Sequence, residues 1–161
     1  MNSIFLVGTR WFGVLGPCNL LIDKLIERGF KVFVFGHKDS RYQQFKSEHV
    51  ELIELNVKRS YFSFFSDLSD ILTLRKFIKS YKPEFIHSFN PKPSLLCYFS
   101  LFFKNDISFL IGVTGLGNTF IKANPLLKKI IEQVMIKSAA KAKYIFFQNP
   151  DDLNFFINNF K

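Results

Sequence analysis

The sequence predicts an open, doubly wound α/β fold: a parallel sheet with helices on both faces. Two observations carry this prediction. Short apolar runs of strand length lack strict alternation, which is typical of parallel strands that are covered on both faces. Longer amphipathic stretches separate these runs, so that a strand followed by a helix recurs along the whole chain. The 161 residues suffice for one domain with its own core, and no linker divides them.

The expected strands and helices follow each other in a regular order. Apolar runs predict strands at residues 4–7, 32–35, 52–55, 85–87, 109–113 and 144–147. Amphipathic stretches predict helices at 17–28, 40–47, 67–81, 91–103, 125–141 and 150–160. Four of these helices begin at a proline, and three of the prolines follow an asparagine: Asn90-Pro91, Asn124-Pro125 and Asn149-Pro150. Asparagine is a good N-cap and proline suits the first helical position, so these pairs mark helix starts.

Composition and charge narrow the classes of function. A formal net charge of +9 favours an anionic partner: a phosphorylated ligand, nucleic acid or an anionic membrane surface. Cys18 and Cys97 lie far apart and without clustered histidines, which argues against a metal site or a disulfide framework and for reduced thiols. The longest apolar run, at 95–103, is much shorter than the roughly 20 residues that span a bilayer. We therefore expect a cytoplasmic protein.

The order of strands and helices points to one edge of the sheet as the candidate site. In a parallel α/β sheet the strands end and the following helices begin along a single edge, and ligands bind at these carboxyl ends. Helix N-termini on that edge present free N–H groups and a partial positive charge, which suit a phosphate. The segments to consider are therefore the loops after the first, fourth and fifth strands.

Each of these loops has a functional and a plain structural interpretation. The loop at 8–16 lacks both GxGxxG and GK[ST], which argues against NAD binding and P-loop ATP hydrolysis; it admits a phosphate or sugar, or it is a tight turn. In the next loop His87 ends a strand and is either structural or faces a cleft. Lys92 falls in the first turn of a helix, where it either accompanies a bound anion or points into water. The third loop, GVTGLGNTF at 112–120, has GxxGxG spacing, which alone is typical of a turn.

Four motifs in order give the chain a family resemblance: LIERGFKVFVFG at 25–36, PEFIHSFNPKPS at 83–94, GVTGLGNTF at 112–120 and AKYIFFQNPDD at 142–152. With them the chain resembles the N-terminal domain of the family 4 glycosyltransferases of the GT-B fold, especially bacterial enzymes that build surface polysaccharides and oligosaccharides. The resemblance implies that residues 1–161 form one Rossmann-like half of a GT-B fold, the half that mainly receives the acceptor. It also implies a donor-binding C-terminal domain or subunit outside these residues, without which the chain is expected to be inactive.

The resemblance implies a reaction as well. Such enzymes are usually retaining and independent of metal, so we expect a nucleotide-sugar as co-substrate and no metal or other cofactor. Their acceptors are commonly sugars, including polyprenyl-diphosphate-linked ones, which implies a peripheral position on the inner face of the cell membrane. Retaining transfer of this kind depends on electrostatic stabilisation of the leaving diphosphate. No catalytic residue is identified in this half.

The resemblance assigns substrate binding to eight residues of the three loops: Gly13, Gly16, His87, Asn90, Lys92, Thr114, Gly115 and Gly117. Gly13 and Gly16 fall in the loop nearest the donor diphosphate, and the later glycines are expected to form the floor of an acceptor cleft. Two positions depart from the family. Phe89 stands where many relatives have a second histidine. Thr114 stands where many have a histidine that contacts the donor sugar or its phosphate, and only a hydroxyl contact carries over to it.

Some alternatives stay open from the sequence. Residues 58–65, KRSYFSFF, place two cations beside four aromatic residues, which suits insertion into a membrane interface; alternatively Phe62 and Phe65 pack into the core. The helix at 125–141 is interpreted as a core helix with a lysine-rich solvated face. The alternative function is a non-catalytic anion-binding or membrane-recruiting subunit of a split enzyme. Nucleic-acid binding comes last, because an Arg-rich recognition helix and a stacking-aromatic motif are both missing.

Overall fold

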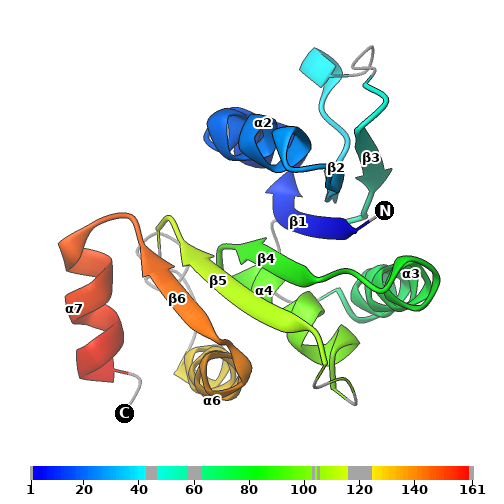
Figure 1. The fold of residues 1–161 in the computed structure, drawn as a ribbon. Coiled ribbons are helices and arrows are strands. Elements are labelled where there is room, and N and C mark those ends of the chain that lie inside the picture. Colours follow the sequence, from blue (N-terminus) through cyan, green and yellow to red (C-terminus); the bar gives the residue numbers. More distant parts are fainter. Residues whose placement is uncertain are drawn as a thin grey trace.

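Six parallel strands form one sheet with the order β3-β2-β1-β4-β5-β6 (Figure 1). The computed structural model describes residues 2–42, 47–57, 63–102, 104, 106–115 and 125–159. The strands are β1 (Ser3–Arg10), β2 (Lys31–His37), β3 (Val50–Glu54), β4 (Phe85–Phe89), β5 (Ser108–Val113) and β6 (Tyr144–Phe147). Every neighbouring pair runs parallel. The predicted doubly wound parallel sheet is confirmed, with a strand at each expected position.

The helices are α1 (Trp11–Leu15), α2 (Asn19–Glu27), α3 (Phe64–Tyr81), α4 (Pro91–Ser100), α6 (Pro125–Lys141) and α7 (Pro150–Asn159), with a 3₁₀ turn at Ser40–Tyr42. The helix predicted over 17–28 is confirmed as α2, but the short helix α1 at residues 11–15 was not predicted. Burial of Trp11, Val14 and Leu15 against the sheet stabilises this turn although it contains Gly13. Of the helix expected at 40–47, residues 40–42 form the 3₁₀ turn, Ser47 is not helical, and residues 43–46 fall outside the described part.

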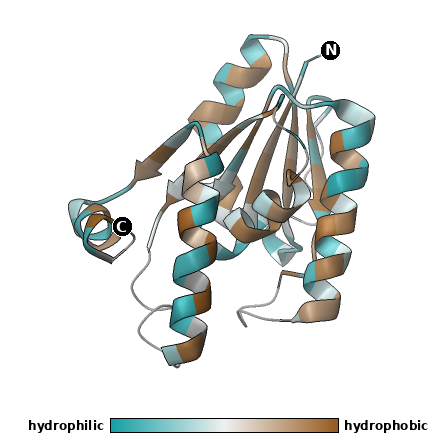
Figure 2. Ribbon diagram, turned by 90° about the horizontal axis from the view of Figure 1, so that it is seen from below, coloured by the Kyte–Doolittle hydropathy of each residue, from teal (hydrophilic) through white to brown (hydrophobic). Residues whose placement is uncertain are grey.

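Helices cover both faces of the sheet, α2 on one side and α3, α4 and α6 on the other (Figure 1). Successive strand residues point to opposite faces, so each strand contributes to two hydrophobic clusters. One cluster joins strand residues to α1 and α2, among them Ile4, Leu6, Val34, Trp11 and Ile22. The other joins them to α3 and α4, among them Phe5, Phe35, Leu74, Ile78 and Leu96. The strands are accordingly mostly brown in Figure 2, whereas the helices alternate between brown and teal.

Phenylalanine rings account for much of the second cluster. Phe5 lies 5.2 Å from Phe33 and 4.9 Å from Phe35 between ring centroids, and Phe77 of α3 packs edge-on against Phe35 at 5.3 Å. Such edge-to-face contacts add stabilisation beyond the burial of area. The 22 phenylalanines of the chain are therefore partly a core composition, although several of them lie on the surface.

Three helices begin at the predicted prolines: α4 at Pro91, α6 at Pro125 and α7 at Pro150. Asn149 is the expected cap of α7, because its Oδ1 accepts the backbone N–H of Asp152 at 2.8 Å. The interpretation of α6 as a core helix is confirmed in part. Met135 is buried against the domain, while Ile130, expected on the apolar side, is exposed.

Candidate functional site

The strand order locates the candidate site at the carboxyl ends of β1 and β4. These two strands are neighbours, and the chain winds outward from them in opposite directions, through β2 and β3 on one side and β5 and β6 on the other. At such a switch point the loops on the carboxyl edge diverge and leave a crevice, where open α/β sheets bind their ligands. The described residues that follow β1, β4 and β5 therefore share one edge, and residues 116–120 of the third loop lie outside the described part.

Asn90 joins the end of β4 to the end of β5. Its side-chain Oδ1 accepts the hydroxyl of Thr114 at 2.7 Å and the backbone N–H of Thr114 at 3.3 Å. Its own backbone N–H donates to the Gly112 carbonyl at 2.8 Å. Neither side chain is buried in the core, so the pair holds polar groups at the open edge of the sheet, at the start of α4.

The backbone of Asn90 is strained. Its φ of 73° and ψ of 161° fall in a region that is essentially confined to glycine. The prediction of Asn90 as a side-chain N-cap of α4 was wrong, because the amide bonds to Thr114 instead of the helix N–H groups. Strain of this kind costs about 1–3 kcal/mol and clusters at functional sites, where it fixes a side chain in a required direction.

Gly115 follows Thr114 with a φ of 155°, a value that residues with a Cβ rarely adopt. No atom lies within 4 Å of the place where a Cβ would stand, so the conformation of this glycine, and not lack of room, excludes other residues. Gly117 lies outside the described residues.

His87 lies two residues before the end of β4 and not at its end, since the strand continues to Phe89. Its ring packs at a tilt against that of Phe89, with centroids 4.2 Å apart, and its centroid lies 5.8 Å from that of Phe146 of β6. Burial lowers the pKa of His87 to about 4, so the imidazole is neutral at neutral pH. Its Nε2 is buried without a hydrogen-bond partner among the described residues.

Lys92 does not point into water. Only 9% of the residue is exposed, and its ammonium forms an ion pair with Asp67 of α3, with 2.5 Å between Nζ and Oδ2. Asp67 offsets the unfavourable position of a cation in the first turn of α4. Asp70, one turn further along α3, is buried, and its Oδ1 accepts the backbone N–H of Asn56 at 2.8 Å. Burial raises the pKa of Asp70.

Gly13 and Gly16 lie in and just after α1, and no hydrogen bond of the described chain joins them to Asn90 or Thr114. Near the end of β1, packing requires two different glycines, Gly8 and Gly36. A Cβ on Gly8 would lie 2.4 Å from a methyl group of Val14. A Cβ on Gly36 of β2 would lie 3.0–3.2 Å from backbone atoms of Gly8, Arg10 and Trp11.

We expect Gly36→Ala to lower the free energy of unfolding by about 1–3 kcal/mol, because the added methyl meets backbone that cannot move aside. Gly13→Ala is the matched control. Nothing lies within 4 Å of its Cβ position, and alanine favours the helix, so this variant should gain about 0.5–1 kcal/mol. Urea unfolding of both variants measures the difference, and equal effects would contradict it.

Sequence reasoning missed a charged group beside β1 and β2. Asp39 forms an ion pair with Arg41, with 2.8 Å between Oδ1 and Nε, and the Arg41 guanidinium lies 3.5 Å from the centre of the Phe12 ring. The hydrogen bond from Arg41 lowers the pKa of Asp39 to about 2, and Arg10 at the end of β1 acts in the same direction. The separation of Asp39 and Arg41 by only two positions in the sequence could have indicated this ion pair. Within the described ranges, no three His, Cys, Asp or Glu side chains are grouped as metal ligands.

The fold and the polar groups at its carboxyl edge define a Rossmann-like domain of the class that binds ligands where its strands end. The chain belongs to the glycosyl transferase 4-like family, whose model matches residues 4–149. This match confirms the resemblance seen in the sequence motifs. No curated protein sequence matches the chain significantly.

Solved structures share the fold at low identity. A glycosyltransferase from Rickettsia africae ESF-5 is 17% identical with a TM-score of 0.72, over 99% of this chain and 40% of that one. Sucrose-phosphate synthase from Thermosynechococcus elongatus is 15% identical with a TM-score of 0.71, over 98% and 45%. UDP-GlcNAc 2-epimerase from Methanocaldococcus jannaschii is 13% identical with a TM-score of 0.63, over 98% and 42%. The chain thus spans less than half of these proteins and corresponds to one half of a GT-B fold.

Proposed function

We propose that the chain is the acceptor-binding half of a retaining glycosyltransferase, which transfers a sugar from a nucleotide-sugar to a surface-polysaccharide or lipid-linked oligosaccharide acceptor. The hydrogen-bonded pair of Asn90 and Thr114 supports this proposal best, because it holds an amide and a hydroxyl at the carboxyl edge where α4 begins. Sugar hydroxyls bind such amide and hydroxyl groups, and a phosphate suits the adjacent helix N-terminus.

The proposed roles of these residues follow from the hydrogen bonds and charges that their groups can offer. Asn90, Thr114 and the backbone of Gly115 would orient the acceptor, and neutral His87 would lie beneath them without adding charge. The leaving diphosphate needs cations or helix N-termini, which a second, donor-binding domain would mainly supply. We propose a peripheral position on the inner membrane face for an enzyme with a lipid-linked acceptor. Among the described helices, none is both long and apolar enough to cross a bilayer.

Binding to a soluble acceptor analogue tests this role. A short-chain prenyl-diphosphate-linked sugar should bind the chain, while a panel of nucleotide-sugars should bind far more weakly, as followed by NMR titration. Asn90→Gly should weaken analogue binding about 3–10-fold, because it removes an amide hydrogen bond. The same variant suits the backbone angles of residue 90, so it should not lower stability.

Two outcomes would overturn the proposal. Tighter binding of a nucleotide-sugar than of the acceptor analogue would assign the domain to the donor. If the chain, mixed with a donor-binding partner, changes a nucleotide-sugar at C2 without transfer, the reaction is epimerisation. The anomeric configuration of any transfer product, read by NMR, tests retention separately.

A further inference from the structure

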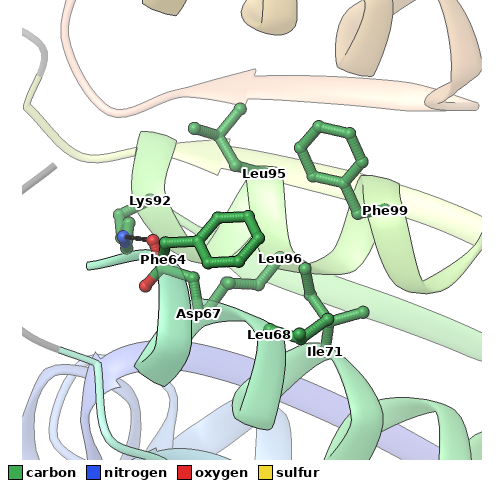
Figure 3. A pocket seen from close by; sticks show the side chains of 8 residues that line it. All are labelled: Phe64, Asp67, Leu68, Ile71, Lys92, Leu95, Leu96 and Phe99. Carbon is green, nitrogen blue, oxygen red and sulfur yellow. Dashed lines mark hydrogen bonds and ion pairs between the residues drawn. The ribbon is translucent and has the colours of Figure 1, made fainter. Parts of the chain in front are cut away.

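An apolar groove separates α3 from α4 on the side of the sheet opposite α2 (Figure 3). It has a volume of about 290 Å³ and is lined by apolar side chains, among them Phe64, Leu68 and Phe99. The ion pair of Lys92 and Asp67 closes one end. Apart from this pair, the groove offers a ligand hydrocarbon contacts alone.

Large apolar side chains remain exposed around this groove. Phe64 and Phe65, at the start of α3, are 74% and 85% exposed, and their rings pack edge to face at 5.6 Å. The exposed apolar surface continues over Leu68 and Leu72 of α3, Phe99 of α4 and Phe102 just after α4. Soluble monomers rarely expose contiguous apolar patches of this kind without a partner. Phe65 therefore does not pack into the core; Phe62 and the rest of 58–62 lie outside the described residues.

The exposed charges that α3 carries beside this patch are all positive. On α3 they are Arg75, Lys76 and Lys79, while Asp67 and Asp70 of the same helix are largely buried. α4 contains no acidic residue, and exposed Lys104 follows it. The Lys141 ammonium of α6 donates to the Lys104 carbonyl at 2.8 Å, which brings another cation to this end of α4. Cations beside exposed aromatic rings complement an anionic lipid surface.

The topology relates the groove to the candidate site. Because α3 follows β3 and α4 follows β4, both helices begin at the carboxyl edge of the sheet. The groove therefore starts beside Lys92, two residues after Asn90, and runs away from that edge between the helices (Figure 3). A lipid whose chain lies in the groove would carry its head group toward Asn90 and Thr114.

We propose that the face formed by α3 and α4 docks on an anionic bilayer, with Phe64 and Phe65 in the interfacial layer and one acyl chain in the groove. This inference rests on the proposed function in one respect: a lipid-linked acceptor would be presented at the same membrane. The bilayer is favoured over a protein partner because the exposed cations of α3, and Lys104 just after α4, lie beside the exposed apolar side chains of the two helices.

Vesicle sedimentation tests this surface. The chain should bind phosphatidylcholine vesicles that contain phosphatidylglycerol at least about tenfold more tightly than phosphatidylcholine alone, and high salt should weaken the binding. Phe65→Glu should reduce binding to the anionic vesicles about tenfold or more. Leu20→Glu is the matched control, because Leu20 is 73% exposed on α2, across the sheet, and this variant should bind as the wild type does. Circular dichroism verifies that both variants are folded.

Three results would overturn the inference: equal binding to neutral and anionic vesicles, equal loss in both variants, or a dimer that Phe65→Glu dissociates while vesicle binding persists. The last result would assign the face to a second copy of the chain. The soluble acceptor analogue separates this inference from the proposed function. If the chain binds vesicles but not the analogue, the proposed docking surface stands and the proposed acceptor role fails. If it binds the analogue but not vesicles, only the docking surface fails.

Discussion

Replacing Lys92 by methionine is expected to lower the free energy of unfolding by about 3–5 kcal/mol. The side chains of Lys92 and Asp67 are only 11% and 16% exposed, so the variant leaves a largely buried carboxylate without its cation. The loss arises from the stranded charge and not from the strength of the pair. Urea unfolding at neutral pH measures it.

A double variant separates these two causes. Lys92→Met combined with Asp67→Leu removes both charges, and it should recover most of the stability that the single variant loses. Recovery should be incomplete, because Asp67 Oδ2 also accepts the backbone N–H of Ser63 at 3.2 Å, at the start of α3. If the double variant is less stable than Lys92→Met, the ion pair does not explain the single loss.

Acidification is expected to destabilise the domain through His87. Its pKa is about 4 in the folded chain against 6.5 for an ordinary histidine. The unfolded chain therefore binds more protons between these two values, and stability rises with pH across that window. The full difference amounts to about 3 kcal/mol, present above pH 6.5 and lost as the pH falls toward 4. Urea unfolding at pH 7 and at pH 4.5 measures most of it.

Two glutamine variants assign this pH dependence. His87→Gln cannot titrate, so its stability should change much less between pH 7 and pH 4.5. His49→Gln, at an exposed position, should keep the wild-type dependence. An unchanged slope in His87→Gln would show that other groups bind the protons. The contact partners favour His87, because protonation would place a charge between Phe89 and Phe146.

The sequence pattern was sufficient for the sheet because buried parallel strands read as apolar runs, and each run indeed forms a strand. The same pattern also predicted that Asn90 and Thr114 lie at one edge of the sheet. It could not predict their hydrogen bond, because that bond depends on a backbone conformation at Asn90 that periodicity does not encode. The ion pair of Lys92 with Asp67 was missed for a related reason. Its partners lie 25 residues apart on two helices, and only their packing brings them together.

Helix α1 could not be predicted from the local helix propensity of its residues. Gly13 and Gly16 made residues 8–16 read as a loop, yet Trp11 anchors a helical turn there through burial and a hydrogen bond from its Nε1 to the Ile53 carbonyl at 3.1 Å. Tertiary contacts of this kind override local preference in short helices. The glycines that the packing does require, Gly8 and Gly36, were visible in the sequence but carried no signal of the close approach between β2 and the end of β1.

The central place of β1 has a consequence for the order of events during synthesis. β1 pairs with β2 on one side and with β4 on the other, so this strand is synthesised well before its second partner, which begins only at Phe85. Until then the edge of β1 that later pairs with β4 exposes unpaired N–H and C=O groups, which are a template for unwanted strand pairing. Distant pairings of this kind also slow folding. The emergence of residues 85–89 is thus the point at which β1 can gain its second partner, while the core still awaits Leu96 and later residues.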